Sequence, residues 1–183
     1  MPDTNNRFIL STERLGLRLW IDSDIEPFAQ MNQDKEVMKY FPNTLSYSET
    51  QELVNRIKLH FDKHNFGLYA VEDKASGQFI GFTGFSIPAF DAFFTPCIEI
   101  GWRYKKEFWG KGLATEAANA CIKYGFETLG FDKIVSFTST LNIDSEKVMK
   151  RIGMTWAGYF DHPKIEKKNP LCRHVLYQLA HPQ

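Results

Sequence analysis

The sequence is poor in cysteine and carries no pattern of residues that would hold a metal. Its three cysteines, Cys97, Cys121 and Cys172, are odd in number and far apart, which argues against a disulfide framework or a CxxC metal site. His60 and His64 have the i,i+4 spacing of two metal ligands, but the sequence offers no third ligand nearby. We therefore expect a solvated helix face there and no bound metal.

The sequence also lacks net charge, a block of basic residues and a long apolar run. Its 22 Lys and Arg residues balance 22 Asp and Glu residues, which argues against the basic patch that a nucleic-acid partner requires. No apolar stretch approaches the ~18 residues of a membrane span, and the N-terminus has no signal-peptide pattern. These absences predict a cytoplasmic protein without a membrane or nucleic-acid partner. We expect it to be a monomer or homodimer.

What the chain does have is the length and apolar content of one folded domain. Its 183 residues are enough to bury a substantial core without division into two, so we expect a single domain over residues 1–183. The 16 phenylalanines require a place in a core, a pocket or an interface. No repeat or linker interrupts the sequence.

Hydrophobic periodicity predicts a mixed order of strands and helices. Ser46 and Glu49 form a capping box that begins a long amphipathic helix, and two short helices are expected before it, at 22–32 and 34–41. Two further helices are expected after Gly112 and after Asn142. Alternating or continuous apolar runs predict seven strands, at 14–20, 66–72, 78–88, 97–104, 133–139, 155–160 and 173–179. This order predicts an α+β sheet flanked by helices.

Glu99 is the one acid in the otherwise apolar strand 97–104. Strand alternation places it on one face with Gly101 and Arg103. Burial would raise the pKa of this carboxyl group toward neutral pH and make it a candidate general base. The alternative is a structural ion pair with Arg103.

A glycine-rich turn, "WGKGLAT" from Trp109 to Thr115, stands directly before a helix. Helix N-termini of this kind bind anions through free backbone N–H groups. The turn does not fit GxxxxGK[ST], and it lies too late in the chain for a first dinucleotide-binding unit. Taken alone, such a turn is more often structural, a tight turn that packs the helix closely.

Several spaced motifs together resemble the GNAT superfamily of N-acetyltransferases, and most closely its RimJ/RimL-like branch. They are "EIGWRYKKEFWGKGLATEA", the helix and strand that follow, and "NIDSEKVMKRIGM"; "TERLGLRLW", "GFTGF" and "RHVLYQL" extend the match over most of the chain. The resemblance implies a GNAT-like α+β fold. Its central, mostly antiparallel, twisted sheet would have about seven strands and about four flanking helices, with strand 97–104 splayed away from strand 133–139.

The resemblance also implies acetyl-CoA as cosubstrate and identifies the residues that would bind it. The family's pyrophosphate loop, Gln/Arg-x-x-Gly-x-Gly/Ala, departs from its pattern only at Trp109, and Lys111 could add a charge. The backbone between the splayed strands would bind the pantetheine arm, and Asn142 resembles a residue that contacts it. The implied cofactor-binding residues are Ile100, Gly101, Trp102, Trp109, Gly110, Lys111, Gly112, Leu113, Ala114, Thr115, Asn142 and Ser145.

The sequence departs from the family pattern at the residue that would donate a proton to the leaving thiolate. Many family members carry a tyrosine seven residues after the Asn of the Asn-x-x-(Ala/Ser) helix, but Met149 occupies that position and cannot donate a proton. Ser145, three residues after Asn142, is the substitute acid, unless it only bonds the backbone of a helix that Asn142 caps. His162 is an alternative to Glu99 as the base.

The sequence thus predicts an acetyl-CoA-dependent N-acetyltransferase that acts on a primary amine by direct attack in a ternary complex. The acceptor would be a protein N-terminus or a small-molecule amine. The segments expected on the acceptor side are the region of Tyr40 and Phe41, the loop Phe90 to Thr95, and Asp161 to Pro170. The alternative is a CoA-binding sensor or scaffold without turnover, which Met149 suggests.

Overall fold

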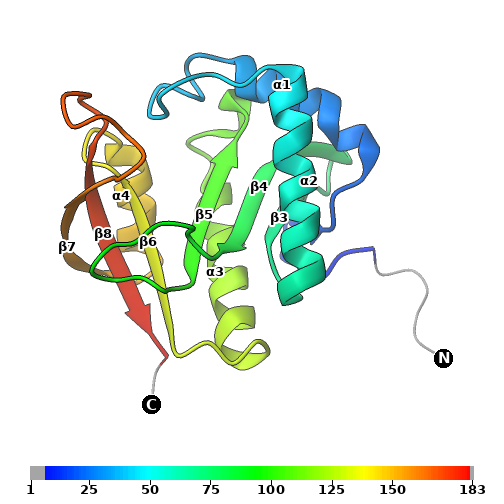
Figure 1. The fold of residues 1–183 in the computed structure, drawn as a ribbon. Coiled ribbons are helices and arrows are strands. Elements are labelled where there is room, and N and C mark those ends of the chain that lie inside the picture. The colour runs from blue at the N-terminus through cyan, green and yellow to red at the C-terminus, as the bar shows by residue number, and fades with distance from the viewer. Residues whose placement is uncertain (1–6, 182–183) are drawn as a thin grey trace.

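The computed structural model describes residues 7–181, which form one eight-stranded sheet in the order β1-β2-β3-β4-β5-β6-β8-β7 (Figure 1). Neighbouring strands are antiparallel except β5 and β6, which run parallel. The strands are β1 (Leu10–Ser11), β2 (Leu15–Arg18), β3 (Leu68–Asp73), β4 (Gln78–Ser86), β5 (Glu99–Tyr104), β6 (Lys133–Ser139), β7 (Thr155–Asp161) and β8 (Arg173–Ala180). The expected mixed, mostly antiparallel fold is confirmed. The expected seven strands are all present, and the eighth is the two-residue β1.

Within residues 7–181, four α-helices and two 3-10 turns flank the sheet. The long helix begins as predicted, because the Glu49 N–H donates to Ser46 Oγ at 3.3 Å and the Ser46 N–H donates to the Glu49 carboxylate at 2.7 Å. The helices are α1 (Ile25–Gln33), α2 (Tyr47–His64), α3 (Leu113–Glu127) and α4 (Ile143–Arg151), and the 3-10 turns are η1 (Asp22–Asp24) and η2 (Lys106–Phe108).

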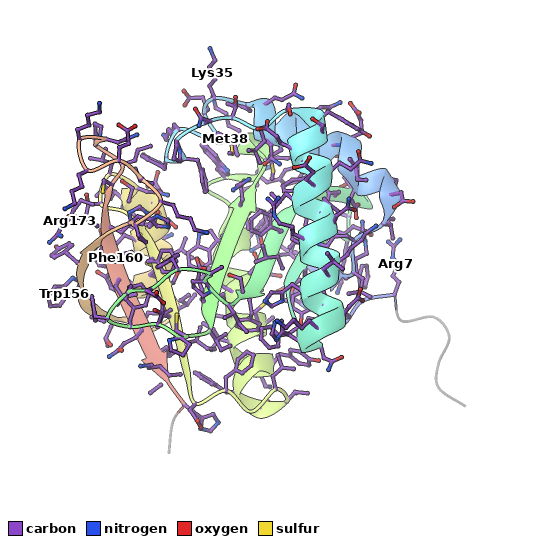
Figure 2. All side chains as sticks on the ribbon, viewed as in Figure 1. Arg7, Lys35, Met38, Trp156, Phe160 and Arg173 are labelled. Carbon is purple, nitrogen blue, oxygen red and sulfur yellow. The ribbon has the colours of Figure 1, made fainter. Side chains whose placement is uncertain are left out.

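The prediction of a helix at 34–41 is wrong. Residues 35–40 form turns, which begin where the Asp34 side chain accepts a hydrogen bond from the Glu36 N–H at 2.8 Å and so competes with helix formation. The apolar residues of the segment are still used, since Val37 and Met38 are buried. Figure 2 shows Lys35 projecting away from the molecule above Met38.

The sheet lies between two pairs of helices, and each pair packs on its own hydrophobic cluster. Helices α1 and α2 pack on one face of the sheet, against Phe79 and Phe82, and α3 and α4 pack on the other, against Ile100 and Tyr104. A Cβ atom at Gly125 would lie 2.9 Å from the Phe85 ring, so α3 approaches the sheet as closely as its small residues predicted.

The histidines considered as metal ligands and the three cysteines can now be placed in the fold. His60 is half-buried rather than solvated, and its Nδ1 donates to the Phe66 carbonyl at 2.8 Å. Within residues 7–181, no group of three or more His, Cys, Asp or Glu side chains could hold a metal ion. All three cysteines are free. No helix in the described part of the chain is long and apolar enough to cross a membrane.

Strands β5 and β6 separate after a single paired position, as the family resemblance implied. Strand β4 pairs with β5 over six positions, whereas β5 and β6 pair only at Glu99 and Val135 within the described chain. Two hydrogen bonds close the junction: the Val135 N–H donates to the Ile98 carbonyl at 2.8 Å, and Ser136 Oγ donates to the Ile100 carbonyl at 2.9 Å. Beyond Ile100 the strands diverge (Figure 1).

Candidate active site

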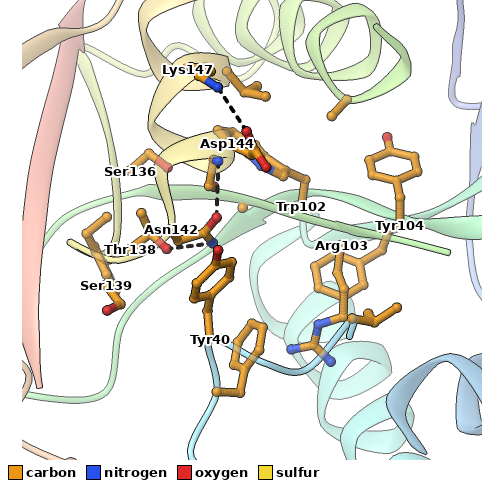
Figure 3. Close-up of a pocket in the computed structure, with 18 of the residues that line it drawn as sticks. Tyr40, Trp102, Arg103, Tyr104, Ser136, Thr138, Ser139, Asn142, Asp144 and Lys147 are labelled. Atoms are coloured by element: carbon orange, nitrogen blue, oxygen red, sulfur yellow. Dashed lines mark hydrogen bonds and ion pairs between the residues drawn. The ribbon is translucent and has the colours of Figure 1, made fainter. Parts of the chain in front are cut away.

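A cleft of about 830 Å³ occupies the space where β5 and β6 diverge. This volume lies within the range of small-molecule sites. Its walls come from both strands, the turn before α3, the first turn of α4, the segment between α1 and α2, and the connection between β7 and β8, and Figure 3 shows residues from several of these elements around one opening. The cleft therefore joins parts of the chain that are far apart in sequence.

One end of the cleft is the glycine-rich turn before α3. Gly110 and Gly112 have φ values of 72° and 76°, and a Cβ atom at Gly110 would meet nothing within 4 Å. Gly112 is the N-cap of α3, so the backbone N–H groups of the first helical turn are not covered by a capping side chain. This geometry suits an anion, because backbone donors and the positive end of the helix dipole are accessible together.

Arg14, which directly precedes β2, holds this turn in place. Its Nη1 donates to the Lys111 carbonyl at 2.9 Å and its Nε donates to Glu116 at 2.7 Å. The side chain of Lys111, predicted as an added charge, lies over the Phe108 ring with Nζ 5.1 Å from the ring centre. An anion bound at this turn would therefore meet mainly main-chain groups.

The wall formed by β5 offers unpaired backbone groups. The carbonyls of Ile98 and Ile100 point toward β6, because they accept hydrogen bonds from Val135 and Ser136. Strand alternation directs the backbone N–H and C=O of Trp102 the same way, where β6 has already diverged. Of the residues expected to bind through this strand, Ile100 is thus partly used within the protein and Trp102 is free for a ligand.

Glu99 lines the cleft close to the junction of β5 and β6. Burial raises the pKa of its carboxyl group to about 7, and the hydrogen bond that Ser86 Oγ donates at 3.0 Å opposes part of that rise. The alternative ion pair with Arg103 is not formed. A carboxyl group with such a pKa can exchange a proton near neutral pH.

The first turn of α4 brings Asn142 and Ser145 to the opposite wall. Asn142 is the N-cap: its Oδ1 accepts from the Ser145 N–H at 3.2 Å, and its Nδ2 donates to Thr138 Oγ1 at 3.1 Å (Figure 3). Ser145 therefore takes the first-turn place expected of it, while its side chain still lines the cleft. Met149 is fully buried in the core and does not reach the cleft.

His162 lines the cleft but is poorly suited to act as the base. Burial and the neighbouring His174 lower its pKa to about 4, so the ring is neutral at physiological pH. Its Nδ1 accepts a hydrogen bond from the Lys164 N–H at 3.2 Å, which leaves the proton of the neutral ring on Nε2. The ring could accept a proton at Nδ1 only by losing that bond.

Of the three segments expected on the acceptor side, two line the cleft and one does not. Tyr40 and Phe41 line the cleft, as do His162, Lys164 and Ile165 of the β7–β8 connection. No cleft-lining residue in the described chain comes from 90–95; Phe90 and Phe94 pack against Phe137 and Phe160.

Arg103 also lines the cleft, whereas the sequence pattern suggested it only as an ion-pair partner of Glu99. Its guanidinium bonds Asn32 Oδ1 at 2.7 Å, from a helix that is 71 positions away in sequence. Strand parity placed Arg103 on the correct face. Only the tertiary fold shows which side chains surround it.

The parallel strands β5 and β6 thus diverge over the uncapped N-terminus of α3, with a titratable carboxyl group at their junction. The sequence profile of the Acetyltransferase (GNAT) domain matches residues 14–155. The chain therefore belongs to the GNAT acetyltransferase family and is an acetyltransferase enzyme. Enzymes of this fold use acetyl-CoA.

Individual relatives agree with the family. The uncharacterized protein YkkB of Bacillus subtilis (strain 168) is 31% identical over 154 residues, which cover 84% of this chain and 88% of YkkB. The crystal structure of a GNAT-family acetyltransferase from Bacillus anthracis is 28% identical, with a TM-score of 0.77 over 93% of this chain and 97% of that chain. RimL, a ribosomal L7/L12 alpha-N-protein acetyltransferase solved in complex with coenzyme A, shares the fold at 17% identity, with a TM-score of 0.76 over 92% of this chain and 95% of its own.

Proposed function

We propose that this protein transfers the acetyl group of acetyl-CoA to a primary amine by direct attack in a ternary complex. The observation that carries the proposal is the single cleft that connects the anion-binding turn before α3 to Glu99 at the junction of β5 and β6. One substrate spanning these points would have a phosphate-bearing end and a reacting end, which acetyl-CoA has. The proposed enzyme is one domain over residues 1–183, of the RimJ/RimL-like branch that its motifs resemble.

In this proposal the pyrophosphate binds the backbone of the turn before α3, and the pantetheine arm continues between the diverged strands. The main-chain groups of Trp102 would pair with the arm as an added strand does, and Asn142 and Ser145 would line its other side. The accessible backbone at Gly110 and Gly112 fits this role, because phosphate oxygens must approach main-chain donors closely. The proposed contacts of the turn comprise Trp109, Gly110, Lys111, Gly112, Leu113, Ala114 and Thr115.

Glu99 is the proposed general base. A primary amine is mostly protonated at neutral pH, and attack on the thioester requires its neutral form. A carboxylate with a pKa of about 7 accepts that proton, directly or through a water molecule. Ser145, which lines the facing wall, is the proposed donor to the departing thiolate.

The thiols of the protein support direct transfer rather than a covalent acetyl-enzyme. None of the three cysteines is among the described residues that line the cleft. Burial raises the pKa of the Cys97 thiol to about 11 and raises that of Cys121 further, which disfavours the reactive thiolate. The amine is then the nucleophile that meets the thioester, and positioning supplies much of the rate.

The proposal is tested by acceptor-dependent release of thiol from acetyl-CoA across primary amines and peptides with free N-termini. We expect at least one acceptor to release thiol in step with formation of its acetylated product. CoA binding without acceptor-dependent release across the whole panel would overturn the proposal. It would favour the alternative of a CoA-binding sensor or scaffold, which Met149 suggested because its buried side chain cannot donate a proton.

A further inference from the structure

Arg103 is a cation in the cleft without an anionic partner. It forms no ion pair within residues 7–181, and its one side-chain hydrogen bond is donated by Nη1 to Asn32 at 2.7 Å. Its Nε is buried without a partner. An arginine has five N–H donors, and leaving them unsatisfied in a partly desolvated site is costly. Burial lowers its pKa to about 10, so it remains charged at neutral pH.

The surroundings of Arg103 hold its guanidinium in a defined place. The Phe41 ring centre lies 4.2 Å from Cζ and the Phe82 ring centre 5.4 Å, which are cation–π distances. Together with the bond to Asn32, these contacts fix a planar group whose remaining donors suit a two-oxygen anion. Figure 3 shows the side chain leaving β5 toward the segment that carries Tyr40.

Arg103 is too far round the sheet to serve the pyrophosphate of the cosubstrate, because the two lie on opposite faces. The anion-binding turn leads into α3, which packs on the face of the sheet that carries Ile100 and Tyr104. Arg103 belongs to the opposite face, beside Phe82 and helix α1. An anionic group at Arg103 therefore belongs to the second substrate, which approaches from the α1 and α2 side.

Gly101 leaves room between Arg103 and Glu99 on the same strand face. A Cβ atom at Gly101 would meet only Glu99 Oε1 within 4 Å, at 3.9 Å, so the strand surface there is open. The Cα atoms of residues 99 and 103 are separated by roughly 13 Å in an extended strand, a span that two long side chains shorten. A molecule lying over Gly101 can thus reach the carboxyl group with one end and the guanidinium with the other.

We propose, on the basis of the acetyl-transfer function above, that the acceptor is an amine that also carries a carboxylate. Its amino group lies near Glu99, and its carboxylate pairs with Arg103. The separation along the strand favours a carboxylate several bonds away from the amine over one on the adjacent carbon. Arg103 is then a specificity-determining residue of the acceptor site.

The test compares kcat/KM for matched acceptors: ω-amino acids of increasing chain length, each beside its own carboxamide. A charge-assisted pair is worth about 10- to 100-fold, so the wild-type enzyme should prefer each longer acid over its amide by that factor. Arg103→Gln should abolish the preference through KM for the acid, while KM for acetyl-CoA stays unchanged. Arg103→Lys should retain part of it, and thermal unfolding verifies that both variants fold.

Lys105→Gln is the matched control. It removes a positive charge two residues after Arg103, directly beyond the end of β5, at a residue that does not line the cleft, and should leave the acid preference unchanged. Equal rates for acids and amides in the wild type, or a preference that survives Arg103→Gln, would overturn the assignment while leaving acetyl transfer intact. Should no pair release thiol, acetyl transfer is judged on the wider panel of amines and peptides above, and calorimetry of the same acids and amides decides whether Arg103 binds the carboxylate. Tighter binding of the acids that Arg103→Gln removes supports the assignment, and equal binding refutes it.

Discussion

Glu99 combines two properties that its sequence position alone could not guarantee: it faces a cleft, and its carboxyl group titrates near neutral pH. If it is the base, activity requires its deprotonated form, so kcat/KM should fall as the pH drops below about 7. Glu99→Gln keeps the size and the hydrogen bond from Ser86 but removes the basicity. We expect turnover to fall about 10²- to 10⁴-fold, with CoA affinity nearly unchanged and the limb near pH 7 lost.

Ser86→Ala is the matched variant for this prediction. The Ser86 hydroxyl stabilises the carboxylate form and holds the pKa of Glu99 below the value that burial alone would give. Its removal should move the acidic limb to higher pH without abolishing activity. A Glu99→Gln enzyme with the rate and pH profile of the wild type would show that Glu99 has no part in proton transfer.

At the scale of single elements, the turn before α3 should determine CoA affinity through its backbone. Gly112 has a φ of 76°, which a β-branched residue adopts only with strain, although a Cβ atom there would meet only Arg14, at 3.7 Å. Gly112→Val should therefore weaken acetyl-CoA binding well over tenfold by altering the turn and blocking close approach. Calorimetry measures the affinity, and circular dichroism verifies the fold.

Lys111→Ala is the control within the same turn, because it removes a charge and leaves both glycines. We expect a smaller loss of affinity, since the Lys111 side chain lies over Phe108. Unchanged affinity in a folded Gly112→Val protein would show that the pyrophosphate binds elsewhere.

The elements differ in how far the sequence predicts them. Helix α2 was predictable because its capping box and its apolar stripe both lie within the helix itself. Residues 34–41 have helical periodicity, but the side chain of Asp34 satisfies the backbone locally and the segment forms turns. Strand β1 is only two residues long and gains its pairing from β2, so no local period announces it.

At the scale of the whole molecule, the sequence identifies several residues of the site one by one. It does not show that the fold brings them together around one cleft. Glu99 and the glycine turn were predictable, because each has a local pattern with a chemical reason. The lack of an anionic partner for Arg103 was not predictable, because its surroundings include Asn32 and Phe41, which are distant in sequence. The divergence of β5 and β6 was expected only through the family resemblance, because a strand's own residues do not encode its pairing partner.

The central claim is direct transfer between two substrates bound together, and a single-turnover experiment tests it most directly. Enzyme in excess is mixed with acetyl-CoA, first without and then with a reactive primary amine, and free thiol, acetylated amine and the mass of the protein are followed in time. We predict no thiol release and no acetylated protein before the amine is added, and afterwards one thiol released for each acetylated amine formed. Thiol release without the amine, or an acetylated protein that forms first and then decays, would contradict the account.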